Sequence, residues 1–324
     1  MPMPTSSSSR ARLRDAHGYS MIELMVAIAV LTVISGSMLD GVFKITRVSG
    51  TVNNRSEMHS AVRNATELLQ QEIGQAGRVA LPDADASTIA YDETLATTAV
   101  AAAGSATVTL NAIAGIFQGE KLVFDTGANE ETIVVSSVNT GNKQITATFV
   151  NAHAANVPVH AYGGFAAGVV PPSPGFTNGS TGTLLKVFGD INDTGRMVYI
   201  EYWCDTSGGN LYRRSMDYAA GSKPALTPDL ALLNHIQPNP DGTPCFTYDT
   251  SSANNVTYVV NVAITLTVET AQKDPQTGLF QRETKALLNV APRNVFNVWQ
   301  MAGLGIQNRI QPMPPSVTTL LAAQ

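Results

Sequence analysis

One carboxylate, that of Glu23, lies in a run of apolar residues, where a charge is energetically unfavourable. Glu23 is the only charged residue between Tyr19 and Leu39, in a run that otherwise holds apolar residues, small hydroxyl residues and glycine. A charged side chain in such surroundings costs about 3 kcal/mol or more unless a partner pairs with it. The chemistry that this position permits is therefore charge pairing in a dry environment, with a cation supplied from elsewhere.

A second candidate is an oxygen-rich loop. Asp190, Asn192 and Thr194 alternate along the chain, and Glu201 lies at the twelfth position, where a calcium loop places a bidentate carboxylate. Glu201, however, falls in a run typical of a strand, and a turn rich in Asp, Asn and Gly explains the same residues. We therefore interpret this segment as a turn, keep calcium as the alternative, and expect no other cofactor.

Acidic residues and a histidine recur near the middle of the chain. Asp125, Glu130, Glu131 and His153 could gather around a metal, but they are better interpreted as turn acids and a lone histidine at a strand edge.

Two cysteines, Cys204 and Cys245, are too few for a disulfide scaffold and enough for one bridge. The alternatives are a disulfide and two buried thiols. Charged residues make up only 14% of the chain, which is typical of an exported, β-rich protein. Because an oxidising compartment favours the bridge, we predict the disulfide.

Other chemistry is not indicated. The five histidines are scattered, and the sequence has no Gly-x-Ser-x-Gly, no His-Glu-x-x-His and no phosphate-binding loop, so we expect no enzymatic activity. The net charge of −5 provides no basic surface, so nucleic acid is not an expected partner.

The run around Glu23 is predicted to form a helix long enough to cross a membrane. Residues 19–39 would span roughly 30 Å, the thickness of a bilayer core. Arg10, Arg12 and Arg14 precede the run, and cations at that end keep it in the cytoplasm.

The segment from Gly18 to Met25, Gly-Tyr-Ser-Met-Ile-Glu-Leu-Met, resembles the processing signal of type IV prepilins and type II secretion pseudopilins. The family pattern is a glycine, an aromatic residue that is usually Phe, and a glutamate five residues after the glycine. The resemblance implies a leader over 1–18, cleavage after Gly18 by a prepilin peptidase, and N-methylation of Tyr19. The departure from Phe to Tyr should not stop processing. The new amine of one subunit could then pair with Glu23 of a neighbour in a filament, which would set the register of assembly.

A helix is predicted over 19–80, with 19–39 as the transmembrane segment and filament core. No proline occurs between Met21 and Leu81, and apolar residues recur in steps of three and four from Val42 to Ala76. The opposite face carries charges, among them Glu72. We expect bends at Gly36, Gly41 and Gly50, and a C-terminal cap at Gly77.

Short β-type runs separated by turn signals fill the rest of the chain. We predict an α+β fold: a long N-terminal pilin helix packed on an antiparallel β-sheet head, with an inserted all-β module. The predicted divisions are an inserted barrel or sandwich over 83–162, a Pro/Gly linker over 163–182, a C-terminal sheet domain over 183–300 and a flexible tail over 301–324.

Residues 65–78 and about 183–294 look like the corresponding parts of PilW-type minor pilins, with J-type pseudopilins second. This resemblance implies a minor type IV pilin near the pilus tip that helps to initiate assembly, with a type II secretion pseudopilin as the alternative. Implied partners are the prepilin peptidase, other major and minor pilins, and the inner-membrane assembly platform. Residues 83–162 could contact a surface ligand in adhesion. The implied precursor crosses the inner membrane once, with its head in the periplasm, before it enters the pilus at the cell surface.

Overall fold

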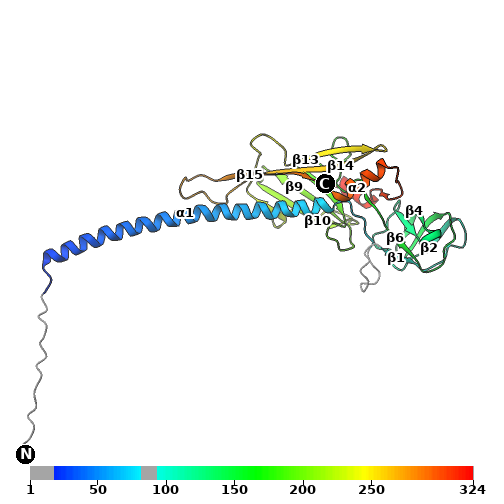
Figure 1. The fold of residues 1–324 in the computed structure, drawn as a ribbon, viewed down its shortest axis with the longest axis horizontal. Coiled ribbons are helices and arrows are strands. Elements are labelled where there is room, and N and C mark those ends of the chain that lie inside the picture. Colours follow the sequence, from blue (N-terminus) through cyan, green and yellow to red (C-terminus); the bar gives the residue numbers. More distant parts are fainter. Residues whose placement is uncertain (1–17, 82–92, 324) are drawn as a thin grey trace, which may run out of the picture. The chain divides into compact units, whose positions relative to one another are not determined.

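The computed structural model describes residues 18–81 and 93–323, so residues 1–17 of the predicted leader lie outside it. Two compact units are distinguished, Met1–Asn53 with Asp274–Gly278 and Asn54–Lys273 with Leu279–Gln324. The expected α+β architecture is confirmed, because a long N-terminal helix is followed by antiparallel sheets (Figure 1).

Helix α1 (Met21–Gln75) is continuous over 55 residues, which corresponds to about 80 Å. It begins after Ser20, whose hydroxyl accepts a hydrogen bond from the backbone N–H of Ile22 at 3.4 Å. The glycines expected to bend it, Gly36, Gly41 and Gly50, do not interrupt its helical hydrogen bonding. The helix ends two residues before Gly77, whose φ of +84° is the left-handed conformation expected of a glycine cap.

The second half of α1 packs on the sheets through one apolar stripe. Its members are spaced by three and four residues, as the sequence predicts, and all are buried in one core with the strands of the head: Met58, Val62, Ala65, Leu69, Ile73 and Ala76. Glu72, which was predicted on the charged face opposite this stripe, is nevertheless buried, with 2% of the residue's surface exposed.

Two antiparallel sheets form the head. The first has the order β11-β10-β9-β8 and the second the order β12-β14-β13, with β15 paired to β14. Their bounds are β8 (Leu184–Gly189), β9 (Val198–Asp205), β10 (Asn210–Asp217), β11 (Ala231–Asn234), β12 (Ile236–Gln237), β13 (Phe246–Ala253), β14 (Val256–Glu269) and β15 (Arg282–Val290). Short 3₁₀ turns, η1 (Gly127–Asn129) and η2 (Pro228–Leu230), lie in connecting segments.

A six-stranded sheet lies within the predicted insertion, in the order β1-β6-β3-β4-β5-β2. Its strands are β1 (Glu93–Ala96), β2 (Gly104–Thr109), β3 (Lys121–Phe124), β4 (Glu131–Asn139), β5 (Gln144–Phe149) and β6 (Val157–His160). A bridge between Ala96 and Leu110 joins the two outer strands, so the sheet closes into a small barrel. The barrel core continues into that of the head through Phe165, Phe188 and Tyr199.

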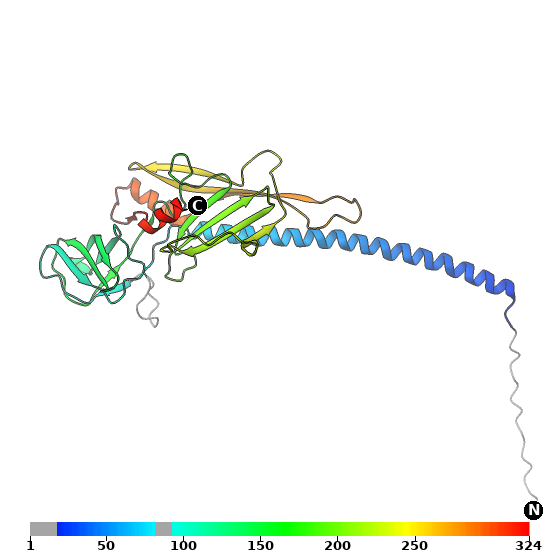
Figure 2. The same cartoon turned by 180° about the vertical axis from the view of Figure 1, so that it is seen from behind.

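Two predicted segments differ from the structure. In the expected linker, β7 (Gly164–Phe165) pairs in parallel with β16 (Ile310–Gln311), and Phe165 is fully buried, so 163–182 is more than a spacer. The expected flexible tail over 301–324 contains the last three residues of α2 (Arg293–Gly303) and all of α3 (Pro315–Ala322). Helix α3 lies beside the β8–β10 sheet (Figure 2), and Val317 and Leu320 are buried, so apolar contacts hold this tail in place.

Candidate functional site

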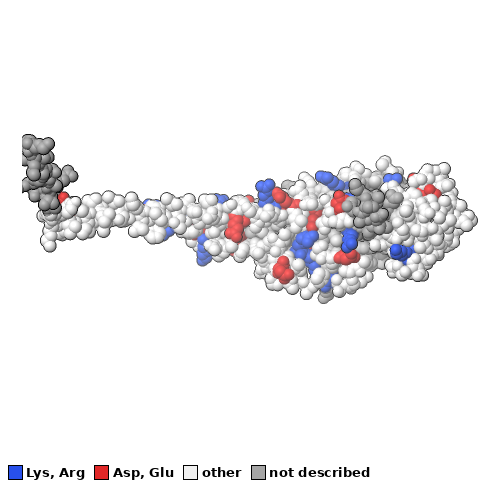
Figure 3. All heavy atoms as spheres, turned by 90° about the horizontal axis from the view of Figure 1, so that it is seen from below, with Lys and Arg blue, Asp and Glu red and all other residues white. Residues whose placement is uncertain are grey.

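The N-terminal part of α1 presents apolar side chains that are exposed among the described residues. Every described residue from Gly18 to Asp40 is exposed, and Tyr19 reaches 84%. Figure 3 shows this part of the helix as an almost uncharged surface on the face in view. Exposed apolar area of this size marks a surface that enters a membrane or meets other chains.

Glu23 lies in the first turn of α1 and is exposed together with Tyr19. No other charge occurs on the helix until Asp40, which pairs with Lys44 at 2.7 Å. By length and composition, α1 is the one helix in the described chain that could cross a membrane; its most apolar window has a mean hydropathy of 2.2. Its apolar stretch therefore carries a single ionisable side chain, near the end where processing is expected.

A buried ionic network fixes the other half of α1 to the head. The carboxylate of Glu72 accepts hydrogen bonds from the hydroxyl of Tyr202 and from Nε and Nη2 of Arg213, the last at 2.5 Å. Burial lowers the pKa of Arg213, but Glu72 outweighs this effect and raises it. Because β9 and β10 supply the two donors, the network fixes both the position and the rotation of the helix on the sheet.

The four candidate calcium ligands do not come together. Asp190 accepts the backbone N–H groups of Thr194 at 2.9 Å and Gly195 at 3.2 Å, which is the hydrogen bonding of a turn. Glu201 instead binds Tyr199 and Arg214 within the sheet. The described residues contain no cluster of three or more His, Cys, Asp or Glu side chains placed to hold a metal. The positions of Asp190, Asn192, Thr194 and Glu201 therefore support the turn.

The sequence predicted a lone histidine at a strand edge, but His153 has two carboxylate partners. Its Nδ1 lies 3.0 Å from Asp125 and its Nε2 lies 2.7 Å from Glu131, and the imidazole is buried against Phe124 and Phe149. Burial lowers the pKa of His153, but the two carboxylates outweigh it and raise the pKa. The protonated ring can donate to both carboxylates at once, so this triad joins the start of β4 to the loop before it and to the loop between β5 and β6.

The cysteines form the disulfide that the sequence predicts. Cys204 is the second-to-last residue of β9, Cys245 directly precedes β13, and both are buried in the core shared with α1. The bridge joins the two sheets of the head.

A row of charges on the first sheet was missed by the sequence analysis. Strand pairing places Lys186 of β8, Glu201 of β9 and Arg214 of β10 side by side. Lys223, from the loop after β10, joins them with its Nζ 2.9 Å from Glu201. Burial raises the pKa of Glu201, but donors from Tyr199 and the cations outweigh it and lower the pKa. The sequence signal that could have indicated this row is the charged residue Glu201 within the otherwise apolar and aromatic run of β9.

The comparison with protein families finds one match, to the prokaryotic N-terminal methylation motif, over residues 13–39. The matched segment contains Gly18, Tyr19 and Glu23 together with the exposed apolar part of α1. This motif is that of type IV prepilins and pseudopilins, and the match leaves the head unassigned. The comparison with curated proteins finds no match.

Proposed function

We propose that this chain is a structural subunit of a type IV pilus, a minor pilin that enters the filament through the first part of α1. The observation that carries the proposal is the methylation motif over 13–39 on a helix whose first nineteen residues, 21–39, are exposed and carry no charge except Glu23. The role is one of assembly rather than catalysis. The same motif supports an assignment to the pilin-like and pseudopilin-like chains.

Processing converts the motif into an assembly signal. A prepilin peptidase cleaves after Gly18, and the new α-amino group of Tyr19 is methylated and remains cationic. In the precursor, the helix crosses the inner membrane with its N-terminus in the cytoplasm and its head in the periplasm. In the filament, the same helix lies among the helices of other major and minor pilins.

Glu23 sets the axial position that the subunit takes in the filament. Lipid and a bundle of apolar helices are similar environments for leucine and valine side chains, so apolar packing alone selects no single axial position. A carboxylate without a partner is disfavoured in both environments, and pairing with the Tyr19 amine of a neighbouring subunit relieves this penalty at one position only.

The head supports a place near the tip. Its two sheets carry an additional barrel, β1–β6, whose bulk would be repeated at every position of a shaft. At the tip, the chain would help the assembly platform to initiate the filament, and residues 83–162 would be displayed for a surface ligand. A type II secretion pseudopilin is the alternative that the same motif allows. Deleting the gene separates them, because loss of pili supports the first and loss of exported substrates with pili intact supports the second.

The N-terminus of the mature protein tests the proposal. We expect mass spectrometry of the protein from its native host to find N-methylated Tyr19 as the first residue. Gly18→Val should abolish cleavage, whereas the matched control Gly41→Val, at a helical glycine with open space around it, should be processed normally. A mature chain that retains Gly18, or that begins beyond Glu23, would refute the proposal.

A further inference from the structure

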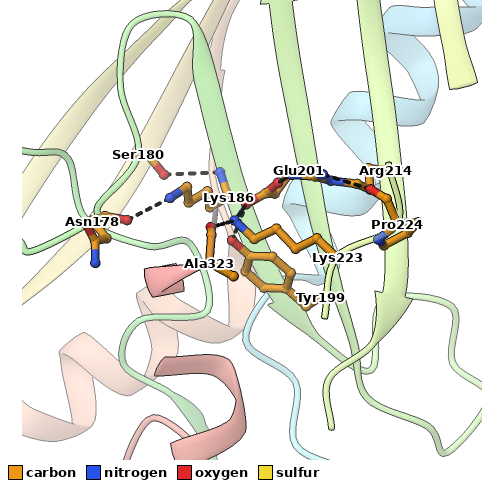
Figure 4. A network of polar contacts seen from close by, with 9 residues as sticks. All are labelled: Asn178, Ser180, Lys186, Tyr199, Glu201, Arg214, Lys223, Pro224 and Ala323. Atoms are coloured by element: carbon orange, nitrogen blue, oxygen red, sulfur yellow. Dashed lines mark hydrogen bonds and ion pairs between the residues drawn. The ribbon is translucent and has the colours of Figure 1, made fainter. Parts of the chain in front are cut away.

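A pocket of about 390 Å³ lies beside the charged row of the first sheet. Its polar wall consists of Lys186, Glu201, Arg214 and Lys223, and Figure 4 shows these side chains converging from neighbouring strands and the loop after β10. The residues before the C-terminus, Leu321–Ala323, line the pocket from another side. A volume at the lower end of the range for ligand pockets fits a small molecule.

The polar wall carries more positive charge than negative. Among the described lining residues, three side chains are cationic and only Glu201 is anionic. The cations are well shielded from water, since the side chains of Lys223 and Arg214 are 5% and 12% exposed. Burial lowers the pKa of Lys186, Glu201 raises it, and the neighbouring Lys223 and Arg214 lower it further. Because these positive charges repel one another and are poorly hydrated, the binding of an anion beside them is favoured.

Besides Glu201, which pairs with Arg214 and Lys223, the acceptors for the cations of this wall are backbone carbonyls. Lys186 donates to the carbonyl of Asn178 at 2.8 Å, Lys223 to that of Ala323 at 2.6 Å, and Arg214 to that of Pro224 at 2.9 Å. These backbone acceptors are neutral, so they satisfy hydrogen bonds without balancing charge.

The Nε–H of Arg214 is the clearest unused donor. It is buried, and it has no acceptor among residues 18–81 and 93–323. Leaving a buried donor without a partner is costly, particularly on a charged group. A ligand oxygen beside Arg214 would remove that cost.

The next cross-strand row supplies an apolar wall. Trp203 pairs with Leu184 of β8 on one side and with Tyr212 of β10 on the other, two residues along from the charges and on the same face. The Trp203 ring stacks on Tyr212 with centroids 5.6 Å apart, yet the residue remains 37% exposed. A fixed, half-exposed indole beside cations suits the flat face of a ring.

We propose that this pocket binds a small organic anion, a carboxylate carried on a ring, with the carboxylate held by Lys186, Arg214 and Lys223 and the ring against Trp203. Two sources share this chemistry, an aromatic acid and a uronic acid. Benzoate and glucuronate represent them, and benzyl alcohol and glucose are the corresponding uncharged controls.

The two tryptophans of the chain provide a readout that needs no amino-acid substitution in the pocket. Full-length mature protein in detergent, labelled with 5-fluorotryptophan, should give two ¹⁹F signals, which Trp299→Phe assigns. We expect benzoate or glucuronate to shift the Trp203 signal in a saturable way and to leave Trp299 unchanged. The uncharged controls should bind at least about tenfold more weakly, since they lack the charge-assisted hydrogen bonds.

Lys186→Met tests the polar wall, and Lys285→Met is the matched control at an exposed lysine of β15. We expect the first to weaken binding about tenfold or more and the second to leave it within about twofold. The proposal is overturned if neither carboxylate shifts Trp203 saturably, if glucose or benzyl alcohol binds equally well, or if folded Lys186→Met binds as wild type does. Absence of binding would mean that the chain itself balances the charge of the pocket. The wild-type titration alone decides the matter if Lys186→Met does not fold.

Discussion

The buried pair of Glu72 and Arg213 makes a quantitative prediction about how α1 is held. Glu72→Leu leaves the guanidinium of Arg213 without its bidentate partner and the hydroxyl of Tyr202 without its acceptor. Breaking a buried pair in this way costs about 3–5 kcal/mol. Because the Arg213 side chain is 24% exposed and can recover some hydration, we expect the lower end, about 3 kcal/mol.

Urea denaturation of the mature protein in detergent, followed by tryptophan fluorescence, measures this change. The matched control is Glu67→Leu, about one turn and a half earlier on α1, whose pair with Arg63 is exposed and screened by water, so this change should leave the urea midpoint nearly unaltered.

A double-mutant cycle isolates the interaction. Replacing both partners, Glu72→Leu with Arg213→Met, removes both buried charges. The double change should therefore cost less than Glu72→Leu alone, about 1 kcal/mol, which is the cost of leaving the Tyr202 hydroxyl without its acceptor. Arg213→Met alone also has a cost, because it leaves the buried carboxylate of Glu72 without its cation, so the coupling free energy should be at least about 2 kcal/mol. The reasoning is refuted if Glu72→Leu costs no more than Glu67→Leu, or if the costs of the two single changes simply add.

Two further predictions concern the head. The pKa of folded His153 lies above its ordinary value of 6.5, so its stabilisation is present below about pH 6.5 and is lost as the pH rises through the folded pKa. The pKa values of Asp125 and Glu131 are lowered, so their stabilisation is present above about pH 4.5 and is lost as the pH falls through the folded values. The urea midpoint should therefore be highest near pH 5–6.5, and a decline above that range that is equally steep in His153→Gln would contradict this assignment. Replacing Cys204 and Cys245 with serine should lower the free energy of unfolding by about 4 kcal/mol for a loop of about 40 residues, and an unchanged urea midpoint without reductant would disprove it.

Local periodicity accounts for what could be predicted. The apolar stripe of α1 from Met58 to Ala76 follows from the helical repeat, and the run rich in valine, isoleucine and threonine over 256–269 forms β14. The methylation motif was readable because Gly18, Tyr19 and Glu23 lie within six residues of one another. Such features depend on neighbours along the chain, which the sequence displays directly.

Long-range partners account for what was missed. Glu72 looked like part of an exposed face because its donors, Tyr202 and Arg213, are 130 and 141 residues away. The charged row around Glu201 likewise depends on strand register, which the sequence leaves open. The C-terminal helix did carry a signal: Val317, Leu320 and Leu321 have helical spacing, but the prolines before them favoured a loose tail.

The same long-range packing changes how the barrel should be tested. Deleting residues 83–162 would uncover Phe165, Phe188 and Tyr199, which share its core. Loss of adhesion in such a deletion would therefore not separate a missing ligand surface from a damaged head. Substitutions at exposed barrel residues such as Val134 and Val150 keep the core intact and test a surface role directly.

The fraction of mature protein that enters filaments is the most direct test of the central role of Glu23. Sheared filaments and membranes would be compared by immunoblot for wild type, Glu23→Leu and the control Glu57→Leu, which lies on α1 beyond the apolar stretch. The account predicts that Glu23→Leu is processed to Tyr19 and retained in the membrane, but reaches filaments at about a tenth of the wild-type level or less, while Glu57→Leu assembles normally. Equal incorporation of Glu23→Leu and wild type would contradict the account.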